Sequence, residues 1–467
     1  MRISHFLYFI TVVFVSCFVS FLVTGCAQIG APTGGPRDSI PPELVSATPK
    51  LLSTNFTANK ITLVFNEYVD VKEVQTNVLV SPYPKTNPQV DFKLKTVTVK
   101  LKDTLLENTT YAINFGNAIQ DNNEGNPFRN FTYVFSTGNT IDSLQLGGQV
   151  IIAETGKKDS TIIALLYRNV DDSAVQKRKP NYIAKLDSSG NFKFTNLSAG
   201  SYKLYALKDG DGGKTYNSKI ELFGFADSEV IVSDSSAPIT LYAFEEEKDI
   251  KKSTTTAPAK TGAQAADKKL KYTPSLSNNE QDLLTNLFLT LNHPLKTFDP
   301  QKIILTDTNY NKINSTITID STQKIIKVNT KWKEENNYRL LVSKDAFSDS
   351  AGTALAKSDT IKFTTKKTAD YGSIVLRFSN LKLAEHPVLQ FVKDQEIYRS
   401  VAITAAMWSD KLFPPGDYEL RILFDNNNNG KWDPGNYGQK LQPERAITLD
   451  TKLNIKANWD NERDVKL

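Results

Sequence analysis

The chain has 467 residues, with 56 basic and 51 acidic side chains and a formal net charge of +5. So small an excess of charge over so long a chain favours neither a nucleic-acid-binding surface nor a polyanionic partner, and no nucleic acid is expected to bind. The 25 Phe and 18 Tyr residues are ample for several folded cores. A chain of this length fits roughly three to five domains.

The N-terminus carries an export signal. Met1 and Arg2 precede a run, residues 6–22, that is almost wholly apolar and uncharged, as in the core of a secretory signal peptide. The run leads into Val23-Thr24-Gly25-Cys26, which resembles the bacterial lipobox. The resemblance implies a signal peptide over residues 1–25, cleavage before Cys26, and lipidation (palmitate) of the Cys26 thiol. An uncleaved anchor helix is the alternative, and in both cases the rest of the chain is exported.

The sequence contains two cysteines. Cys17 lies within the apolar run, so a chain cleaved before Cys26 has no second cysteine for an internal disulfide. The lipidated N-terminus would hold the protein at a membrane, since several acyl chains make a stable anchor. Residues 26–40 are rich in Gly and Pro without periodicity, which predicts a tether.

From residue 41 onward, short runs of alternating apolar and polar residues are separated by turn residues; examples are 60–65, 96–101 and 111–115. Alternation with period two predicts half-buried strands. Such runs in close succession favour β-sandwiches, and helical periodicity is nearly absent. The predicted fold class is all-β, with tandem β-sandwich modules after a lipoprotein signal peptide.

Residues 246–272 interrupt the strand pattern. The segment is rich in Lys, Ala, Thr and Asp, and has no aromatic residue before Tyr272. This composition predicts a flexible linker. The two halves of the chain on either side of it are therefore expected to reorient freely.

The two halves repeat each other at nearly constant spacing. Residues 108–113 match 335–340, residues 135–137 match 363–365, and residues 199–204 match 415–420. This regularity indicates a duplication. Each half is predicted to hold one longer sandwich followed by a smaller one.

Residues 41–138 carry a set of recognisable motifs. They begin with Pro41-Pro42, continue with a strand over 61–69 and the motif Asn108-Thr109-Thr110-Tyr111, and close with Phe135-Ser136-Thr137. The segment resembles the bacterial Ig-like domain named after the SbsA surface-layer protein. Residues 273–366 keep the strand pattern but lack the Pro-Pro entry, and are interpreted as a second, divergent Ig-like domain.

Residues 142–245 contain a Gly-x-Phe hairpin at Gly190 followed by a Gly-x-Tyr strand entry at Gly200. Gly190 supplies the positive φ that the hairpin turn requires. The pattern resembles a transthyretin-like, carboxypeptidase-regulatory-type sandwich. Residues 369–467 retain Pro414-Pro415-Gly416-Asp417-Tyr418 and are predicted to form a second small β-sandwich.

The whole chain resembles Ig-like-domain lipoproteins of Bacteroidetes-type bacteria. This resemblance implies a location in the cell envelope, at the outer membrane, on either its periplasmic or its surface face.

The loop over residues 425–433 is the best candidate for a metal site. Oxygen side chains at alternate positions, with Gly430 at the sixth, fit a calcium loop. The expected ligands are Asp425, Asn427, Asn429, Asp433 and, through its carbonyl, Lys431. Position twelve is Asn436 rather than the Glu of an EF-hand, and an Asn/Gly-rich hairpin loop that needs no metal is the alternative. No cofactor is therefore expected to be required, and Ca²⁺ is the one candidate.

The matching loop of the first half keeps oxygen side chains at Asp209 and Asp211 but has Gly213 in place of the third. The loop shape is repeated while the set of ligands is not. This favours a structural loop in the first half.

No enzymatic activity is expected. Beyond His5 in the apolar signal, the chain offers only His293 and His386, each followed by Pro. Two scattered histidines and a lipidated cysteine cannot assemble a Cys/His or multi-His zinc site. Sugar stacking by aromatic rings is the competing possibility, although a lone Trp more often covers a core; the candidates are Trp332, Trp408, Trp432 and Trp459.

The predicted function is that of a non-enzymatic, lipid-anchored cell-envelope protein that serves as a modular spacer or protein-interaction scaffold. A surface adhesin or glycan-binding lipoprotein is the alternative. The partner, besides the membrane, is expected to be an envelope protein or a glycan. Several Asp-Ser/Thr pairs are similar to O-glycosylation acceptors of Bacteroidetes, and turn residues are the other interpretation; the acceptors would be Ser39, Thr104, Ser143, Ser350 and Thr360.

Overall fold

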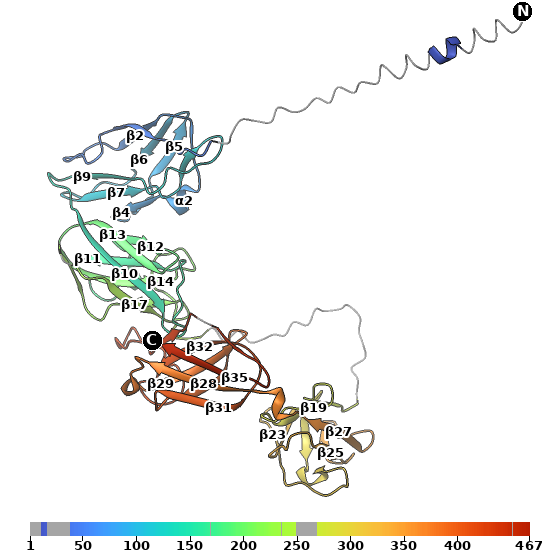
Figure 1. Ribbon diagram of the computed structural model, residues 1–467. Helices are drawn as coiled ribbons and strands as arrows, with labels where there is room; N and C mark the ends of the chain where they lie inside the picture. Colours follow the sequence, from blue (N-terminus) through green and yellow to red (C-terminus); the bar gives the residue numbers. More distant parts are fainter. Residues whose placement is uncertain (1–10, 16–37, 169, 235, 249–268, 451) are drawn as a thin grey trace, which may run out of the picture. The chain divides into compact units, whose positions relative to one another are not determined.

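The computed structural model describes residues 11–15, 38–168, 170–234, 236–248, 269–450 and 452–467. Cys26 and most of the predicted linker, residues 249–268, lie outside this part. The chain divides into two compact units, Met1–Ser143 and Leu144–Leu467. Regular structure is almost entirely β-strand (Figure 1), which confirms the predicted fold class. None of the helices among the described residues has the length and apolar character needed to cross a membrane.

The first unit holds sandwich 1, residues 44–136. Its larger sheet has the order β1 (Leu44–Thr48), β2 (Lys60–Phe65), β6 (Thr96–Lys100), β5 (Gln89–Lys93). The second sheet has the order β4 (Leu79–Ser81), β7 (Thr110–Asn114), β9 (Thr132–Ser136), and β3 (Val69–Val71) pairs with β8 (Ile119–Asp121). A single helical turn, α2 (Val74–Asn77), precedes β4. Apolar residues of both main sheets join in one buried core.

Sandwich 2, residues 144–243, opens the second unit. Its three-stranded sheet has the order β13 (Asn191–Leu197), β10 (Leu144–Ile152), β17 (Ile239–Ala243). The five-stranded sheet runs β12 (Tyr182–Lys185), β11 (Ile163–Arg168), β14 (Gly200–Leu207), β15 (Phe223–Phe225), and β16 (Val230–Val232) also pairs with β14. The short helix α3 (Ala174–Lys177) follows β11.

Sandwich 3 spans residues 272–365. One sheet has the order β18 (Tyr272–Pro274), β20 (Leu287–Leu291), β24 (Ile325–Asn329), β23 (Thr316–Ile319). The other runs β19 (Glu280–Gln281), β27 (Asp359–Thr365), β25 (Asn337–Val342), β22 (Ile303–Thr306), with the pair β21 (Leu295–Phe298) and β26 (Phe347–Asp349) beside them. The 3₁₀ turn η1 (Pro300–Lys302) leads into β22.

Sandwich 4 spans residues 372–466. Its three-stranded sheet has the order β31 (Met407–Phe413), β28 (Gly372–Ser379), β35 (Asp460–Lys466). The five-stranded sheet runs β30 (Glu396–Ala402), β29 (Pro387–Lys393), β32 (Gly416–Phe424), β33 (Arg445–Thr448), and β34 (Leu453–Ile455) also pairs with β32. The 3₁₀ turns η2 (Thr368–Asp370) and η3 (Leu383–Glu385) precede β28 and β29.

The strand orders confirm the repetition seen in the sequence. Sandwiches 2 and 4 have the same two sheets, and each contains one parallel pair, β10 with β17 and β28 with β35. Sandwiches 1 and 3 share a four-stranded sheet, a matching second sheet and a two-stranded ribbon. Since strand order is independent of residue identity, the repeat extends to the fold.

The tyrosines of the repeated motifs tie strands to the turns that precede them. The Tyr111 hydroxyl accepts from Leu106 N at 2.8 Å, and the Tyr338 hydroxyl accepts from Lys333 N at 3.2 Å. In the smaller sandwiches, Tyr202 and Tyr418 each donate to the carbonyl four residues upstream. A buried phenol needs a partner for its hydroxyl, and each repeat provides it in the same way.

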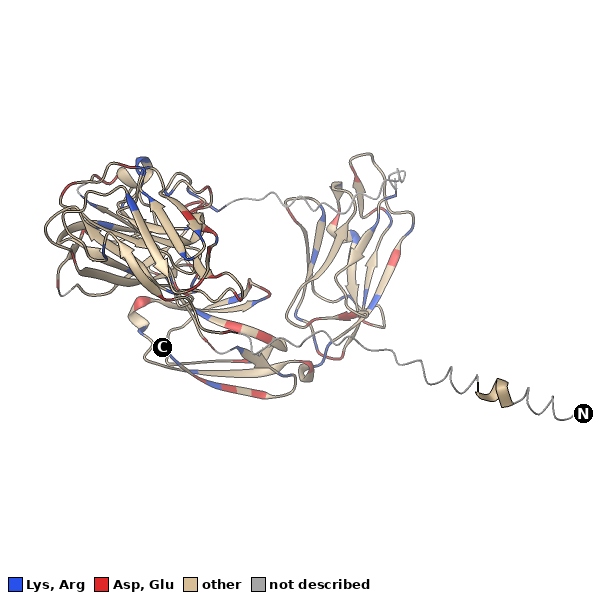
Figure 2. Cartoon of the chain, turned by 90° about the horizontal axis from the view of Figure 1, so that it is seen from above, with Lys and Arg blue, Asp and Glu red and all other residues tan. Residues whose placement is uncertain are grey.

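Basic and acidic side chains alternate along the exposed strands. Figure 2 shows Lys and Arg interspersed with Asp and Glu over the sheets. Many pair across strands, as Arg377 does with Glu462 at 2.5 Å between the parallel strands β28 and β35. The small net charge inferred from composition therefore reflects mixing of both signs over the surface.

Candidate functional site

The predicted calcium loop follows β32 and closes on itself through hydrogen bonds. Asp425 is 1% exposed, and its carboxylate accepts from the backbone N–H groups of Asn429 at 3.2 Å and Gly430 at 2.6 Å. Gly430 has φ +75°, a conformation that favours glycine. The buried carboxylate thus organises the turn through backbone donors.

The remaining predicted ligands are engaged with one another. Asp433 Oδ2 accepts from the side-chain amides of Asn427 and Asn429, each at 2.6 Å. The two amide oxygens accept from the backbone of Asn429 and Lys431. Each of the four predicted side chains therefore has a hydrogen-bonded role within the loop.

The matching loop of sandwich 2 makes the same bonds with the residue types exchanged. In sandwich 4 the amide of Asn427 donates to Asp433. In sandwich 2 the amide of Asn217 donates to Asp211 at 2.7 Å. Acid and amide have changed places across one conserved hydrogen bond. Sandwich 2 also pairs its buried Asp209 with the Lys214 ammonium.

Glu444 completes the loop of sandwich 4. It is 5% exposed, and its carboxylate accepts from Asn426 N at 2.7 Å and Asp433 N at 3.1 Å. Burial, together with the nearby charges of Asp425 and Asp433, raises the pKa of the Glu444 carboxyl. Glu444 is a functional part of the loop that the spacing within residues 425–436 could not reveal, because it follows a further turn.

Among the described residues, no group of three or more His, Cys, Asp and Glu side chains is arranged to hold a metal ion. The loop takes its shape from internal hydrogen bonds, which accords with the Asn/Gly-rich hairpin considered above. Calcium binding at Asp425, Asn427, Asn429, Lys431 and Asp433 stays a prediction. Cys26, the predicted lipidation site, lies outside the described residues.

The candidate sugar-stacking rings differ in exposure. Trp332 is 9% exposed and its indole N–H donates to Thr285 O, while Trp432 donates to Glu444 O. Trp459 is 60% exposed, and the Lys456 ammonium lies 4.7 Å from its ring centroid. Trp459 is therefore the ring that a ligand could reach most readily. The hydroxyl residues of the five Asp-Ser/Thr pairs are all exposed, at Ser39, Thr104, Ser143, Ser350 and Thr360.

Tyr437 joins sandwich 4 to sandwich 2. It lies in the irregular segment between β32 and β33, yet is 5% exposed. Its ring centroid lies 5.0 Å from that of Phe223, 5.3 Å from Phe225 and 5.8 Å from Tyr205. All three contacts have the edge-to-face geometry that aromatic pairs favour. Tyr437 thus inserts into an aromatic cluster built by sandwich 2.

The Tyr437 hydroxyl is hydrogen bonded inside this cluster. It donates to the Asp172 carbonyl at 2.7 Å, so the Tyr205 hydroxyl, 3.0 Å away, donates to the Tyr437 oxygen. The backbone N–H of Tyr437 donates to Glu246 Oε1 at 3.1 Å. Burial and the bond with Tyr205 raise the pKa of the Tyr437 phenol, which keeps its donor proton in place.

Main-chain contacts extend the interface. Ala446 N donates to Ala153 O at 2.7 Å, and the Thr448 hydroxyl donates to Thr155 O. Gly156, with φ +69°, allows the approach: a Cβ there would lie 2.6 Å from Ala446 O and 2.7 Å from Thr448 N. A polar rim surrounds these contacts, with Lys157 and Glu419 at 2.8 Å, Lys440 and Asp172 at 3.1 Å, and Gln442 Nε2 and Phe225 O at 3.0 Å.

The expectation that the two halves reorient freely is wrong for sandwiches 2 and 4. It followed from the composition of residues 246–272 and assumed that nothing but this segment connects the halves. The packed interface fixes the two sandwiches together. The sequence gave little sign of it, because Tyr437 occupies a segment without strand periodicity; a large aromatic residue in an Asn/Gly-rich loop was the one available signal.

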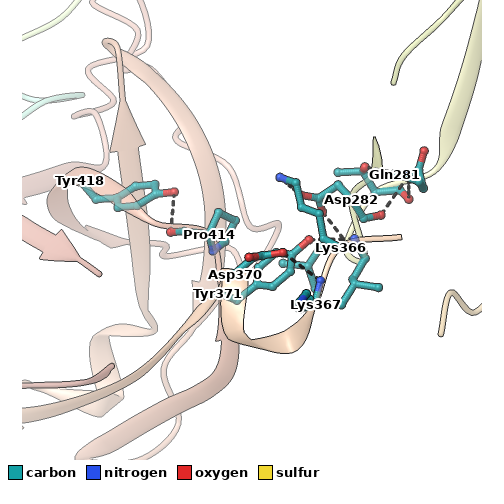
Figure 3. A network of polar contacts seen from close by, with 11 residues as sticks. Gln281, Asp282, Lys366, Lys367, Asp370, Tyr371, Pro414 and Tyr418 are labelled. Carbon is teal, nitrogen blue, oxygen red and sulfur yellow. Dashed lines mark hydrogen bonds and ion pairs between the residues drawn. The ribbon is translucent and has the colours of Figure 1, made fainter. Parts of the chain in front are cut away.

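Tyr371 joins sandwich 3 to sandwich 4 (Figure 3). Its backbone carbonyl accepts from Asn458 N in sandwich 4, while its hydroxyl accepts from Leu283 N of sandwich 3 at 2.8 Å. The side chain is 3% exposed. Lys366 and Asp282 form an ion pair at 3.3 Å beside it. A single buried residue thus contributes to both sandwiches and restrains the short connection between them.

The family model of the bacterial Ig-like domain matches residues 38–137. This confirms the predicted Ig-like nature of that part of the chain. None of the curated proteins compared with the chain matches it.

Three solved structures illustrate the similarity to known folds. Native alpha-2-macroglobulin from Escherichia coli, spanning domains MG0-NIE-MG1, is 13% identical with a TM-score of 0.20, over 40% of this chain and 73% of that one. BcpA, the major pilin subunit of Bacillus cereus, is 10% identical with a TM-score of 0.17, over 69% and 99%. The BSP domain of a biofilm associated protein is 8% identical with a TM-score of 0.17, over 90% and 99%. Scores this low support no inference about the present chain.

Proposed function

We propose that the chain is a non-enzymatic, lipid-anchored protein of the bacterial cell envelope, and that its sandwiches serve as a modular spacer or protein-interaction scaffold. The observation that carries the proposal is that successive sandwiches meet at junctions filled by buried tyrosines, Tyr371 and Tyr437. Junctions of this kind maintain the spacing and orientation of the surfaces on either side. In this proposal sandwiches 1 and 3 are SbsA-type Ig-like domains and sandwiches 2 and 4 are transthyretin-like.

The anchor is supported by the sequence alone. The apolar run followed by Val23-Thr24-Gly25-Cys26 fits a signal that is cut before an acylated cysteine, and the lipidated N-terminus would place the folded part beside the outer membrane. The matched bacterial Ig-like domain at residues 38–137 agrees with a bacterial protein.

Cys26→Ala tests the anchor. Cells producing the wild-type chain are expected to incorporate labelled palmitate into it and to retain it in the outer-membrane fraction. The Cys26→Ala chain should carry no label and keep its signal. Cys17→Ala is the matched control, since Cys17 lies in the segment to be removed. A wild-type protein that is unlabelled and recovered from the cytosol with residues 1–25 intact would overturn the anchor.

Cross-linking in intact cells tests the scaffold role. A photoreactive residue placed at exposed positions of sandwich 1 and sandwich 3 is expected to capture a defined envelope protein. The same residue at a buried position such as Ile61, which is 0% exposed, provides the background. If no exposed position yields an adduct above that background, the scaffold role has no support.

An adhesin or glycan-binding role is the second candidate, and the exposure of Trp459 favours it. An exposed ring with a cation beside it is suited to stacking on a sugar. A glycan array with the wild-type chain and Trp459→Ala separates the two roles. Binding that disappears in Trp459→Ala supports the second candidate, and an empty array for the wild type excludes it.

A further inference from the structure

We propose that the interface between sandwich 2 and sandwich 4 is a self-sufficient docking site, which holds the two halves of the chain together without the covalent connection through residues 249–268. The partner that fits the docking face of sandwich 2 is the Tyr437 segment and β33 of the second half. This property does not follow from a spacer or scaffold role and is independent of the lipid anchor.

The receiving cluster exists within sandwich 2 before docking. Tyr216 and Phe223 stack with ring centroids 4.0 Å apart, and Tyr205 stacks on Phe223 at 5.7 Å. These rings come from β14, β15 and the loop between them. The Tyr216 hydroxyl donates to Glu246 Oε1 at 2.9 Å, and the same oxygen accepts the Tyr437 backbone N–H. The acceptor for the incoming segment is therefore already positioned by sandwich 2.

The incoming segment is likewise organised by sandwich 4. The backbones of Asn436 and Leu441 exchange hydrogen bonds at 2.8 and 2.9 Å, which closes the turn that presents Tyr437. On the other side of the contact, Gly435 packs against Phe244, and a Cβ at Gly435 would lie 2.6 Å from the Phe244 ring. Two preformed surfaces lose little conformational freedom on docking, which favours association.

The arrangement of contacts is that of a stable protein interface. A buried aromatic residue at the centre is encircled by main-chain bonds and by a rim of charged and amide groups, the pattern in which central aromatic anchors supply most of the binding energy. Here the centre is Tyr437, the main-chain bond is Ala446 to Ala153, and the rim includes Lys157, Glu419 and Gln442.

A chain in two pieces tests the proposal with every residue of the mature sequence present. Residues 26–256 and 257–467 are produced together in one cell, and an affinity tag is placed on the first piece. The expected result is recovery of both pieces in a one-to-one complex that survives gel filtration at micromolar concentration. Recovery of the tagged piece alone, when the second piece is soluble and folded by circular dichroism, overturns the proposal.

Variants of the second piece identify the surface responsible. Tyr437→Ala should weaken the complex by about 30-fold or more, as expected for the loss of a central aromatic anchor. Gln442→Ala removes one rim contact and should weaken it less. Trp459→Ala, an exposed aromatic residue of the same sandwich, should leave the affinity unchanged. Equal affinities for Tyr437→Ala and Trp459→Ala would contradict the assigned docking site.

In the uncut chain, fluorescent labels on sandwich 2 and sandwich 4 provide a measurement that does not depend on the pieces folding apart. Energy transfer should give one narrow distribution for the wild type and a broad one for Tyr437→Ala. A broad distribution for the wild type would also overturn the proposal.

Discussion

Asn427 and Asp433 form a pair whose counterparts in the other half, Asp211 and Asn217, are exchanged in type. Both pairs keep one amide-to-carboxylate hydrogen bond, at 2.6 Å and 2.7 Å. A loop that needed the carboxylate at one position, for a metal or for catalysis, would not tolerate this exchange. The bond itself is therefore the feature that both loops have kept.

The exchange predicts the outcome of a double-mutant cycle in sandwich 4. Asn427→Asp alone brings two carboxylates together and should destabilise the sandwich by about 1 kcal/mol, whereas Asn427→Asp with Asp433→Asn should restore most of the loss. Chemical denaturation of the four chains measures the coupling. Additive effects of the two substitutions would show that the side chains do not depend on each other.

Calcium binding by the same loop can be decided separately. If Asp425, Asn427, Asn429, Lys431 and Asp433 take up the cation, wild-type protein titrated with Ca²⁺ in a calorimeter should release or absorb heat, and Asp425→Ala should not. With only two formal negative charges among the ligands, a weak affinity is expected. A flat wild-type titration would leave the loop as a structural hairpin.

Asp121 predicts a pH dependence for sandwich 1. Burial would raise the pKa of its carboxyl, but backbone N–H groups of Gly125, Asn126 and Glu124 outweigh burial and lower the pKa below the usual 3.8. A depressed folded-state pKa contributes stability above the unfolded value, and this contribution is lost as pH falls through the folded value.

Asp121→Asn should therefore reduce the stability of sandwich 1 at pH 6, and the difference from wild type should shrink as the pH falls below the ordinary carboxyl pKa. Thermal unfolding of both chains between pH 6 and pH 2.5 measures it. A difference that stays constant with pH would show that the charge of Asp121 contributes nothing.

At the scale of elements, the edge of β33 and the turn at Gly156 determine how closely two sandwiches approach. Gly156 has φ +69° and no room for a Cβ, whereas Gly212 has φ +80° and no atom within 4 Å of an added Cβ. The two glycines share a backbone conformation and differ in surroundings. They separate the cost of the conformation from the cost of the contact.

Gly156→Ala should disrupt the packing of sandwich 2 on sandwich 4, while Gly212→Ala should cost only about 1 kcal/mol for the left-handed conformation. Limited proteolysis of the full chain and chemical denaturation compare the two. The expected result is a larger loss of stability, and faster cleavage around residues 445–448, in Gly156→Ala. Similar behaviour of the two variants would mean that the close approach is not required.

Elements were the part of the structure that the sequence predicted best. The alternation at residues 60–65 corresponds to β2, where Ile61, Leu63 and Phe65 are all buried. The run 96–101 corresponds to β6. Period-two patterning is a local property, so it can be read directly. The repeats also emerged, because turn and tyrosine motifs recur with the strands they cap.

Contacts between distant segments could not be read in the same way. Tyr437 bonds to Asp172 and Tyr205, and nothing in the local sequence of either partner indicates the other. Glu444 reaches the Asp425 loop only after the chain has turned twice. The docking of sandwiches 2 and 4 depends on these long-range contacts, and for that reason the sequence suggested independent halves.

On the scale of the whole second unit, the docked sandwiches should behave as one cooperative body. Domains unfold separately when few contacts cross their boundary and together when the boundary resembles a core. The boundary here contains a buried aromatic cluster and a main-chain hydrogen bond between Ala446 and Ala153. Opening of either sandwich would expose Tyr437 and its cluster to water, so each stabilises the other.

Hydrogen exchange of the full chain in increasing denaturant can detect this coupling. Peptides covering β14 and β32 should lose protection at the same denaturant concentration in the wild type, because their sandwiches unfold together. In Tyr437→Ala the two midpoints should separate by an amount corresponding to about 2 kcal/mol or more, whereas in Trp459→Ala they should remain together. Separate midpoints in the wild type would show that the interface is too weak to link the two sandwiches, and sandwich 4 would then respond to load or ligand without affecting sandwich 2.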